Sequence, residues 1–378
     1  MNNETDVIHS SSNKITLNEL FHKYKSSYKS AFLDLSIHTF FLSSSFYLMW
    51  FFKNSWVSIF TVPLLSLLNI KTFIIFHDCG HHSYTPNKIL NSVIGIITGI
   101  ITITPFCWNF SHNTHHLTSG NINNIYDYPY NETIFHSLQE YKKFSFPKRQ
   151  IYKFLKHPLF FFTIVPIFKF LVILRFNAII LLTSKLSIKN IKNINTIIII
   201  DQIINNIGIY FLYYFMYQYS VLYHYLITGI INTSIGIILF HSQHGFNPPY
   251  IVNNETYNQK DSGLKGSSFV EIPYLFKYFT GGVEYHDIHH MNSKIPNYNL
   301  QLYHEEAILK SNLLDNIIKL SMLDCYNNLW LGLYDEDTNK FITFEEAEHF
   351  LEKSVSKKHF LEKSVSKKHF LEKSVSKK

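Results

Sequence analysis

The stretch FIIFHDCGHH, residues 73–82, joins an apolar segment directly to a cluster of histidines. Two further clusters follow, HNTHH at 112–116 and HDIHH at 286–290. Spacings of three and four residues place imidazoles on one face of a helix, and neutral imidazole binds zinc, copper, iron and nickel. One histidine pair is often structural, but three compact clusters with a repeated H-x-x-H-H pattern indicate a metal site.

The clusters contain more imidazoles than the four ligands of one tetrahedral zinc ion. They suit two metals, or one metal with further histidines behind its ligands. No carboxylate of the Glu-x-x-His kind used by ferritin-like di-iron bundles accompanies them. Asp78, Glu284 and Asp287 lie beside the clusters, where they either orient imidazole N–H groups or are solvated charges. The sequence therefore predicts a histidine-rich, non-haem metal site.

Six apolar runs separate and flank these clusters, and each approaches the ~20 residues that span a bilayer. So many runs are unusual for the core of a soluble protein. They cover residues 36–52, 56–76, 89–108, 158–183, 196–216 and 221–240. The mean hydropathy of +0.00 is then an average of apolar segments and polar, histidine-bearing ones. The first 30 residues are mostly polar and contain no apolar h-region before Phe32, so we expect no signal peptide.

A common site restricts the topology, because all three clusters must then lie on one face of the membrane. If 36–52 and 56–76 span, the first cluster returns to the side of the N-terminus. A spanning 89–108 run would place the second cluster on the opposite face, so this run should be re-entrant or interfacial, or cross twice. Parity also excludes 158–183 as a span, in agreement with its two basic residues. We predict an all-α integral membrane protein with about four transmembrane helices in two hairpins and a cytosolic helical cap carrying the histidines.

The charge distribution predicts the orientation. Residues 142–192 contain eleven Lys or Arg and no Asp or Glu, and the N-terminal segment is also rich in lysine. By the positive-inside tendency both regions face the cytosol. The basic residues of 142–192 alternate with Phe, Ile and Leu, which favours contact with anionic lipid over contact with nucleic acid.

The domain limits follow from composition. We predict a cytosolic N-terminal segment at 1–35, a membrane domain at 36–348 and a disordered tail at 349–378, where HFLEKSVSKK occurs three times. The repeats hold nine Lys and three Glu, so the rest of the chain carries only +1 of the net charge of +7. The stretch DEDTNK at 335–340, with Glu346, imitates a calcium-binding EF-hand loop. A lysine stands where that loop needs glycine for its sharp turn, so no calcium site is expected.

The clusters resemble the three histidine boxes of the membrane fatty acid desaturases, and are most similar to the Δ12 (omega-6) acyl-lipid type. The resemblance runs from about residue 70 to residue 335, and the combined motifs are specific. It rests on His77-Asp-Cys-Gly-His81, His112-x-x-His115-His116 with Gly120-Asn121, and Glu284-Tyr-His286-x-x-His289-His290 with Ile295-Pro296-Asn297-Tyr298.

This resemblance implies two iron ions at the cytosolic face, held by the boxes and by one more histidine just after the last spanning helix. The expected ligands are His77, His81, His82, His112, His115, His116, His244, His286, His289 and His290. Two choices stay open. Within the first box His81 is favoured over His82, and after the last helix His244 is favoured over His241.

The resemblance also implies an O2-dependent oxidoreductase that introduces a cis double bond, Δ12/omega-6-like, into a lipid-linked acyl chain or an acyl-CoA. A mid-chain CH2 offers no acidic proton, so acid–base groups cannot start its dehydrogenation, whereas an oxidant made from O2 at iron can. The haem motif HPGG of cytochrome b5 does not occur, because His157-Pro158 is followed by Leu159-Phe160. Two electrons should therefore come from a separate cytochrome b5 or ferredoxin. In a eukaryotic cell we expect the endoplasmic reticulum.

Other functions share parts of this pattern. A hydroxylase, an acetylenase or conjugase, or a carotenoid or sterol oxygenase would carry the same boxes. A membrane metal-binding or carrier protein would instead place histidine and other polar residues inside its spans along a path. His38 and His224 are isolated within the apolar runs, and the clusters lie outside them. This arrangement favours an enzyme.

Overall fold

In a computed structural model of the chain, the described residues are 17–125, 135–183, 193–310, 314 and 317–353. They pack as two compact units. The first unit takes its described residues from 1–134 and 158–329, and the second from 135–157 and 330–378. The predicted limits at residues 35 and 348 stay predictions, and this division inside the chain was not foreseen.

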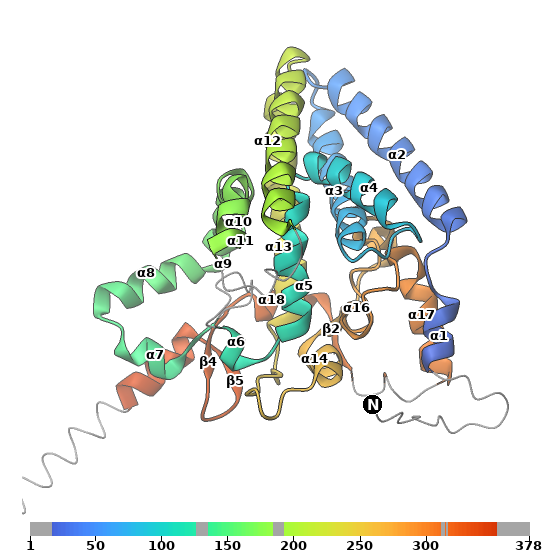
Figure 1. Cartoon of the computed structure of the whole chain (residues 1–378). Helices are drawn as coiled ribbons and strands as arrows, with labels where there is room; N and C mark the ends of the chain where they lie inside the picture. The colour runs from blue at the N-terminus through green and yellow to red at the C-terminus, as the bar shows by residue number, and fades with distance from the viewer. Residues whose placement is uncertain (1–16, 126–134, 184–192, 311–313, 315–316, 354–378) are drawn as a thin grey trace, which may run out of the picture. The chain divides into compact units, whose positions relative to one another are not determined.

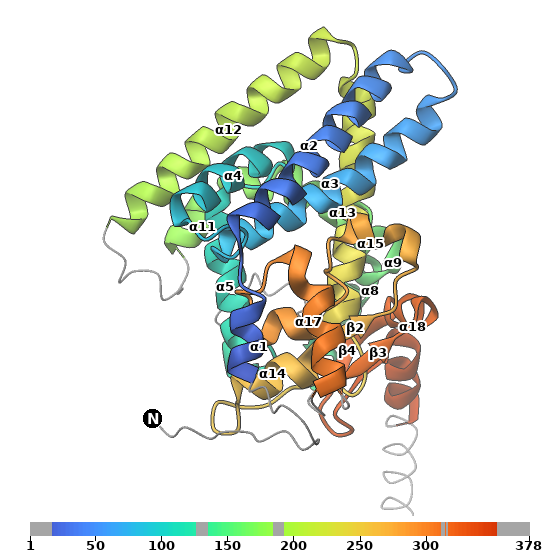
Figure 2. The same ribbon diagram turned by 90° about the vertical axis from the view of Figure 1, so that its right-hand side faces the viewer.

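Four long helices organise the first unit. They form two hairpins, α2 (Tyr28–Phe51) with α3 (Ser58–Gly80), and α12 (Ile194–Gln218) with α13 (Leu222–His244) (Figures 1 and 2). Helix α3 packs between α2 and α13, and most of its second half is buried. The two hairpins agree with the helix pairs expected from the apolar runs.

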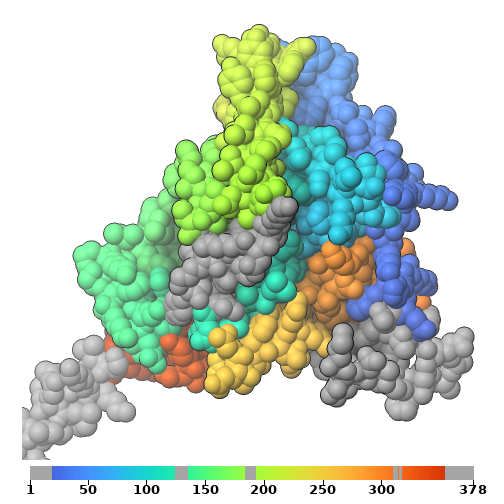
Figure 3. All heavy atoms as spheres, viewed as in Figure 1, coloured from blue at the N-terminus to red at the C-terminus, as the bar shows by residue number. Residues whose placement is uncertain are grey.

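Length and composition allow four described segments to cross a membrane, namely α3, Pro158–Thr183, α12 and α13. Helix α2 is not among those four, although many of its apolar side chains are exposed. Isoleucines cover the outer face of α12, which Figure 3 shows in yellow-green beside α4 (Lys88–Ile101) in cyan. Exposed apolar faces of this extent are suited to contact with lipid.

The apolar run at 158–183 is broken into short pieces. It forms α9 (Pro158–Phe161), α10 (Ile164–Leu171), the 3-10 helix η2 (Ile173–Phe176) and α11 (Asn177–Thr183). Its breaks distinguish it from a straight span, even though the segment is apolar enough for one.

The run at 89–108 also does not continue as one helix. Helix α4 ends at Ile101, and the chain turns by 105° before the 3-10 helix η1 (Phe106–Trp108) and α5 (Asn109–Thr118). This bend gives α5, which carries the second histidine cluster, its own direction.

Side chains of α12 hold the bend in place. Pro105 has no N–H to continue a helix, and the backbone groups around it find partners elsewhere. Asp201 Oδ2 accepts a hydrogen bond from the N–H of Cys107 at 2.7 Å, and Asn205 Nδ2 donates to the carbonyl of Thr104 at 3.1 Å. Polar side chains of the apolar helix α12 thus form the hydrogen bonds that the backbone groups at the break between α4 and η1 cannot form within a helix.

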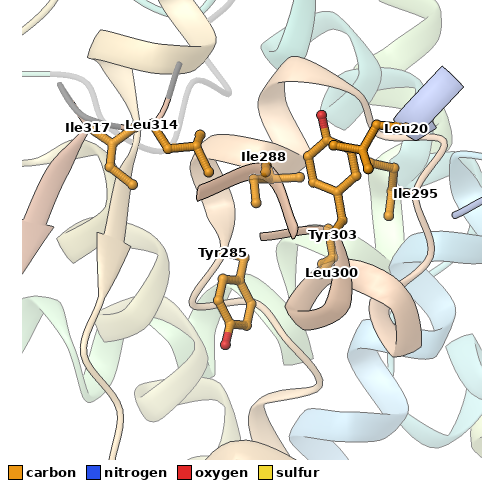
Figure 4. Close-up of a cluster of buried hydrophobic side chains, with 9 residues drawn as sticks. Leu20, Tyr285, Ile288, Ile295, Leu300, Tyr303, Leu314 and Ile317 are labelled. Carbon is orange, nitrogen blue, oxygen red and sulfur yellow. The ribbon is translucent and has the colours of Figure 1, made fainter. Parts of the chain in front are cut away.

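Short helices on the histidine side of the hairpins complete the first unit. They are α1 (Leu17–Lys23), α6 (Ile122–Ile125), α14 (Gln259–Gly266), η4 (Tyr274–Phe276), α15 (Lys277–Thr280), α16 (His286–Met291), α17 (Asn297–Lys310) and α18 (Met322–Asn328). An apolar cluster supports α16, which carries the third histidine cluster. Figure 4 shows Ile288 of α16 in this cluster with Tyr303 and Ile295. Its remaining buried members are Leu20, Tyr285, Leu300, Ala307, Leu314 and Ile317.

The fold is mostly helical, as predicted, but it also contains two small β-sheets, so the expectation of an all-α protein is corrected in this respect. In the first unit β2 (Ser268–Val270) pairs in parallel with β3 (Ile318–Leu320). In the second unit the sheet order is β1-β4-β5, with β1 (His136–Ser137) parallel to β4 (Leu331–Asp335) and β5 (Lys340–Thr343) antiparallel to it. Strands of two to five residues are too short to show a clear alternation of polar and apolar residues.

The second unit packs this sheet against α7 (Leu138–Lys143), followed along the chain by α8 (Phe146–Lys156). Its buried core comprises Leu138, Tyr141, Leu333, Ile342 and Ala347. The stretch that imitates an EF-hand loop forms the β4–β5 turn, where Asp335 accepts a hydrogen bond from the Thr338 hydroxyl at 2.6 Å.

Candidate metal centre

Four helices bring histidines from distant parts of the sequence into one buried region. The first cluster ends α3, the second lies on α5 and the third forms α16, while His244 is the last residue of α13. Every side chain in this set is at least nine-tenths buried: His77, His81, His112, His115, His116, His244, His286, His289 and His290.

The nitrogens form two groups. In group one, a ligand atom from each residue lies within 4.8 Å of the others, and the members are His77, His81, His112, His116 and His289. Group two satisfies the same limit with His115, His244 and His290. His286 adjoins group two, because its Nε2 lies 3.0 Å from Nε2 of His244 and 3.1 Å from Nε2 of His290.

The short distances between nitrogens inside each group are those expected if several imidazoles bind one metal cation. Nε2 of His112 lies 2.7 Å from Nε2 of His77 and 3.0 Å from Nε2 of His116. Nε2 of an imidazole has one in-plane position, either a proton or a lone pair. It cannot form two good hydrogen bonds at once, whereas several lone pairs can point at one metal ion. The same conflict recurs at His244, which touches His115 at 3.2 Å and His286 at 3.0 Å.

An orphaned nitrogen supports the same conclusion. Nε2 of His81 is buried and has no hydrogen-bond partner within the described part of the chain. A buried polar atom without a partner is costly. His81 belongs to group one, so this nitrogen is suited to act as a metal ligand together with the other nitrogens of that group. An all-imidazole donor set is compatible with iron, and equally with zinc, copper or nickel.

Polar contacts fix some of the rings from behind. Nδ1 of His244 lies 2.9 Å from the carbonyl of Gly266, which leaves Nε2 free to act as the donor atom. Nδ1 of His77 lies 3.4 Å from Asp78 Oδ1. Asp78 Oδ2 in turn accepts from the backbone N–H and side-chain Nδ2 of Asn297 at 2.6 and 2.8 Å.

The motif IPNY at 295–298 is explained by this contact, because Asn297 begins α17 and anchors it to the end of α3. Lys71 Nζ donates to Asn297 Oδ1 at 2.5 Å and forms a 3.1 Å ion pair with Asp34. Glu284, by contrast, accepts from the Thr280 hydroxyl at 2.7 Å.

Burial sets the charge state of the centre. It lowers the pKa of His81, His286, His289 and His290 well below the usual range, with further lowering from neighbouring imidazoles. These side chains are therefore neutral lone-pair donors at neutral pH. Burial also raises the pKa of Asp287 to about 7.

Two histidines that the sequence left open lie outside the groups formed by the described residues. His82 is exposed and has a left-handed backbone, with φ of 52°. His241 points elsewhere, with Nε2 3.2 Å from the carbonyl of Asn328. The structure thus brings together nine of the ten expected histidines and leaves out His82. Their role as ligands stays a prediction.

A steric requirement explains why residue 80, in the sequence HDCGH, is glycine. A Cβ built at this residue would lie 1.7 Å from Oδ1 of Asn109. Helix α3 therefore approaches the first residue of α5 closely only because residue 80 has no side chain. This contact brings His77 and His112 within reach of each other.

Aromatic residues that the sequence analysis did not single out enclose the imidazoles. Trp108 stacks on His112, with ring centroids 4.7 Å apart and an interplanar angle of 14°. Phe240 packs on His244 at 5.1 Å and on His115 at 5.4 Å. Both aromatic residues precede a histidine by four positions, which is the only sequence signal that could have identified them.

Two cavities reach the centre. The α3–α13 cavity contacts His77, His112 and His286 and runs along Phe73, Ile74, Gly236 and Phe240. The α5–α10 cavity contacts His112 and His115 and has Lys169 and His241 in its wall. The two cavities share four lining residues, Trp108, His112, Ile237 and Phe240.

The buried histidine groups and the apolar cavity beside them fit what sequence comparison finds. A family model described as fatty acid desaturase matches residues 54–316. The chain belongs to the fatty acid desaturase family. This desaturase is 29% identical over 288 residues to a fatty acid desaturase of Bacillus subtilis (strain 168), covering 74% of this chain and 75% of the relative.

Shorter matches connect the desaturase to relatives with more specific names. It is 32% identical over 118 residues to an sn-1 acyl-lipid omega-3 desaturase (ferredoxin) of Synechocystis sp. (strain ATCC 27184 / PCC 6803 / Kazusa), covering 30% of this chain and 31% of that one. A Delta(12) fatty acid desaturase of Calendula officinalis is 26% identical over 90 residues, 21% of this chain and 24% of the relative. The resemblance of the histidine boxes is confirmed, and the protein is an oxidoreductase of the desaturase type.

Proposed function

We propose that this desaturase introduces a cis double bond at a Δ12/omega-6-like position of a lipid-linked acyl chain, using two iron ions. The observation that carries the proposal is the pair of buried imidazole groups at the end of an apolar cavity. Group one would hold one iron, and group two with His286 would hold the other. Bound iron supplies the O2 chemistry that removes hydrogen from an unactivated CH2.

The residues of this chain position the substrate and exclude water. Phe73, Ile74 and Phe240 give the α3–α13 cavity an apolar wall suited to an acyl chain. His77, His112 and His286 lie in the wall of the same cavity. A chain bound there would have one stretch of CH2 groups beside both imidazole groups, and the aromatic wall would keep that stretch dry.

The membrane arrangement is part of the proposal. The α2–α3 and α12–α13 hairpins would span the bilayer, with the histidines on the cytosolic face. Their ends meet the imidazole groups, since His77 lies in the last turn of α3 and His244 ends α13. The electron donor would be a separate cytochrome b5 or ferredoxin. The Synechocystis relative, an sn-1 acyl-lipid omega-3 desaturase (ferredoxin), supports the second choice.

The test is expression of the full chain in a yeast that makes no polyunsaturated lipids, with a suitable electron donor. Gas chromatography of the fatty acid methyl esters should show a new diene. A hydroxylated product would favour the related di-iron hydroxylases instead. No product, despite good expression and a working donor, would contradict the proposed reaction.

A further inference from the structure

The turn that precedes the third histidine cluster exposes three consecutive large apolar side chains. Tyr274, Leu275 and Phe276 form the 3-10 helix η4, and they are 87%, 75% and 40% exposed. Single exposed apolar residues are ordinary on a protein surface, whereas a contiguous group of them marks an interaction site. Water is therefore an unfavourable surrounding for this turn.

The backbone after the turn is held tightly against α3. Helix α15 packs on α3 (Figure 2), and Gly281 and Gly282 then reverse the chain with φ of 56° and 77°, which glycine adopts without strain. A Cβ at Gly281 would lie 3.0 Å from Cδ of Lys71 and 3.1 Å from Cγ2 of Ile74. We call residues 273–282 the hook.

The hook lies beside the apolar part of the long helices. Its Tyr278 packs on an apolar cluster that contains Leu42 of α2 and Leu68 of α3. Leu68 precedes His77 by nine residues, which corresponds to about 13.5 Å of helix rise. The ring of Tyr278 also lies 5.8 Å from the ring of Phe41, which belongs to the exposed apolar face of α2. The apolar surface of the hook therefore adjoins that of α2.

We propose that the hook is inserted into the membrane interface, where Tyr274, Leu275 and Phe276 contact lipid acyl chains. The inference rests on the membrane arrangement proposed above, in which α2 and α3 span the bilayer. Tyrosine is enriched at the boundary of lipid and water, and interfacial segments bury their apolar side about 5–10 Å into it. The charge of Lys277 does not oppose insertion, because its Nζ lies 3.4 Å from the hydroxyl of Tyr285 on the protein side.

Lipid is favoured over a protein partner by the position of the hook. A protein interface needs a polar rim around its apolar centre, whereas the hook continues into the exposed apolar side chains of α2, among them Phe40 and Phe41. A membrane that surrounds α2 therefore also reaches the hook.

Insertion of the hook would fix the third histidine cluster relative to the membrane surface. The Thr280 hydroxyl donates to the buried carboxylate of Glu284 at 2.7 Å, and the N–H of Tyr285 donates to the carbonyl of Gly282 at 3.1 Å. His286, the first residue of α16, follows directly. The hook and α16 are thus joined by a short, hydrogen-bonded connection.

The experiment places a nitroxide spin label at one added cysteine at a time in the full-length protein, reconstituted in bilayer nanodiscs. The three native cysteines are buried, and the protein without an added cysteine is the blank. Leu275→Cys reports on the hook. Leu309→Cys is the matched control, a leucine of α17 that is 82% exposed, and Ile203→Cys, 52% exposed on α12, reports on the proposed span. Collisions of each label with O2, which concentrates in lipid, are compared with those of a nickel chelate, which stays in water.

We expect the labels at Leu275→Cys and Ile203→Cys to be reached more by O2 than by nickel, and the label at Leu309→Cys to show the reverse. Tyr274→Cys repeats the measurement if Leu275→Cys fails to accumulate. A hook label that behaves like the one at 309, or that neither reagent reaches, would overturn insertion, while a lipid signal at 203 keeps the proposed membrane arrangement. A water signal at 203 would reject that arrangement and the inference with it. The yeast assay tests the proposed reaction separately.

Discussion

His81 and His82 are adjacent in the sequence, and only one of them faces the other imidazoles. Helix α3 ends at Gly80, and His81 still follows the helical path while His82 adopts a left-handed backbone. His81→Ala should therefore lose most of the bound iron and lower activity by more than ~100-fold, since even residues behind metal ligands cost ~10–100-fold. His82→Ala is the matched control and should retain both. Metal analysis of the purified variants, alongside product formation, measures the difference.

A second pair of histidines, His241 and His244, tests the end of α13. His244 lies in group two, while His241 contacts the carbonyl of Asn328. We expect His244→Ala to lose iron and activity together and His241→Ala to keep its iron. The assignment would be wrong if His244→Ala kept a full complement of iron. Full activity of either His116→Ala or His290→Ala would equally remove that residue from the ligand set.

At the level of single residues, spacing alone predicted most of the centre. The H-x-x-H-H pattern identifies His112, His115 and His116 because residues three and four apart share a helix face. Spacing does not show where a helix stops, so it could not exclude His82. It also could not predict Asn297 behind Asp78, because that hydrogen bond joins residues 219 positions apart.

The junction of α3 and α5 depends on one missing side chain. Gly80→Ala should reduce the free energy of unfolding by about 1–3 kcal/mol, the usual cost of overpacking, and should weaken iron binding by separating His77 from His112. The double variant Gly80→Ala/Asn109→Ala should recover part of the loss, because it removes the atom that the new methyl group meets. Thermal unfolding and iron content of both single variants and the double variant complete the cycle. Strictly additive effects would contradict the contact.

Among the elements, the long helices were predictable and the breaks only in part. Parity of membrane crossings predicted that the 89–108 run is re-entrant or interfacial, or crosses twice, and the structure bends the chain by 105° at the break between Ile101 and Phe106. The bend is held by the hydrogen bond from the N–H of Cys107 to Asp201. This bond joins residues 94 positions apart, so no local sequence pattern predicts it. The short strands were missed for the same reason, since β2 and β3 are made by pairing distant segments rather than by strong local propensity.

The molecule as a whole should respond to pH through its buried imidazoles. Burial lowers the pKa of His286, His289 and His290 well below the usual 6.5. Below pH 6.5 the unfolded chain binds protons that the folded chain does not, so stability falls as the pH falls. Each such histidine contributes up to about 1.4 kcal/mol per pH unit. Above pH 6.5 both states are neutral and the effect vanishes.

Thermal unfolding of the iron-free protein in detergent, followed by tryptophan fluorescence, measures this effect. The unfolding temperature should be nearly constant above pH 7 and should drop progressively below about pH 6.5. A flat profile down to pH 5 would contradict the burial of neutral imidazoles.

Helix α5 supplies donors to both imidazole groups, since His112 and His116 belong to group one and His115 to group two. An inserted or deleted residue rotates the rest of a helix by about 100°. One such change between His112 and His115 would turn the later histidines away from their partners in both groups simultaneously. Substitutions at the outward positions of α5 should thus reduce activity far less than any change in its length. In a scan of single-residue insertions along the chain, activity should be lost at every position between His112 and His116 and retained at positions beyond the ends of α5.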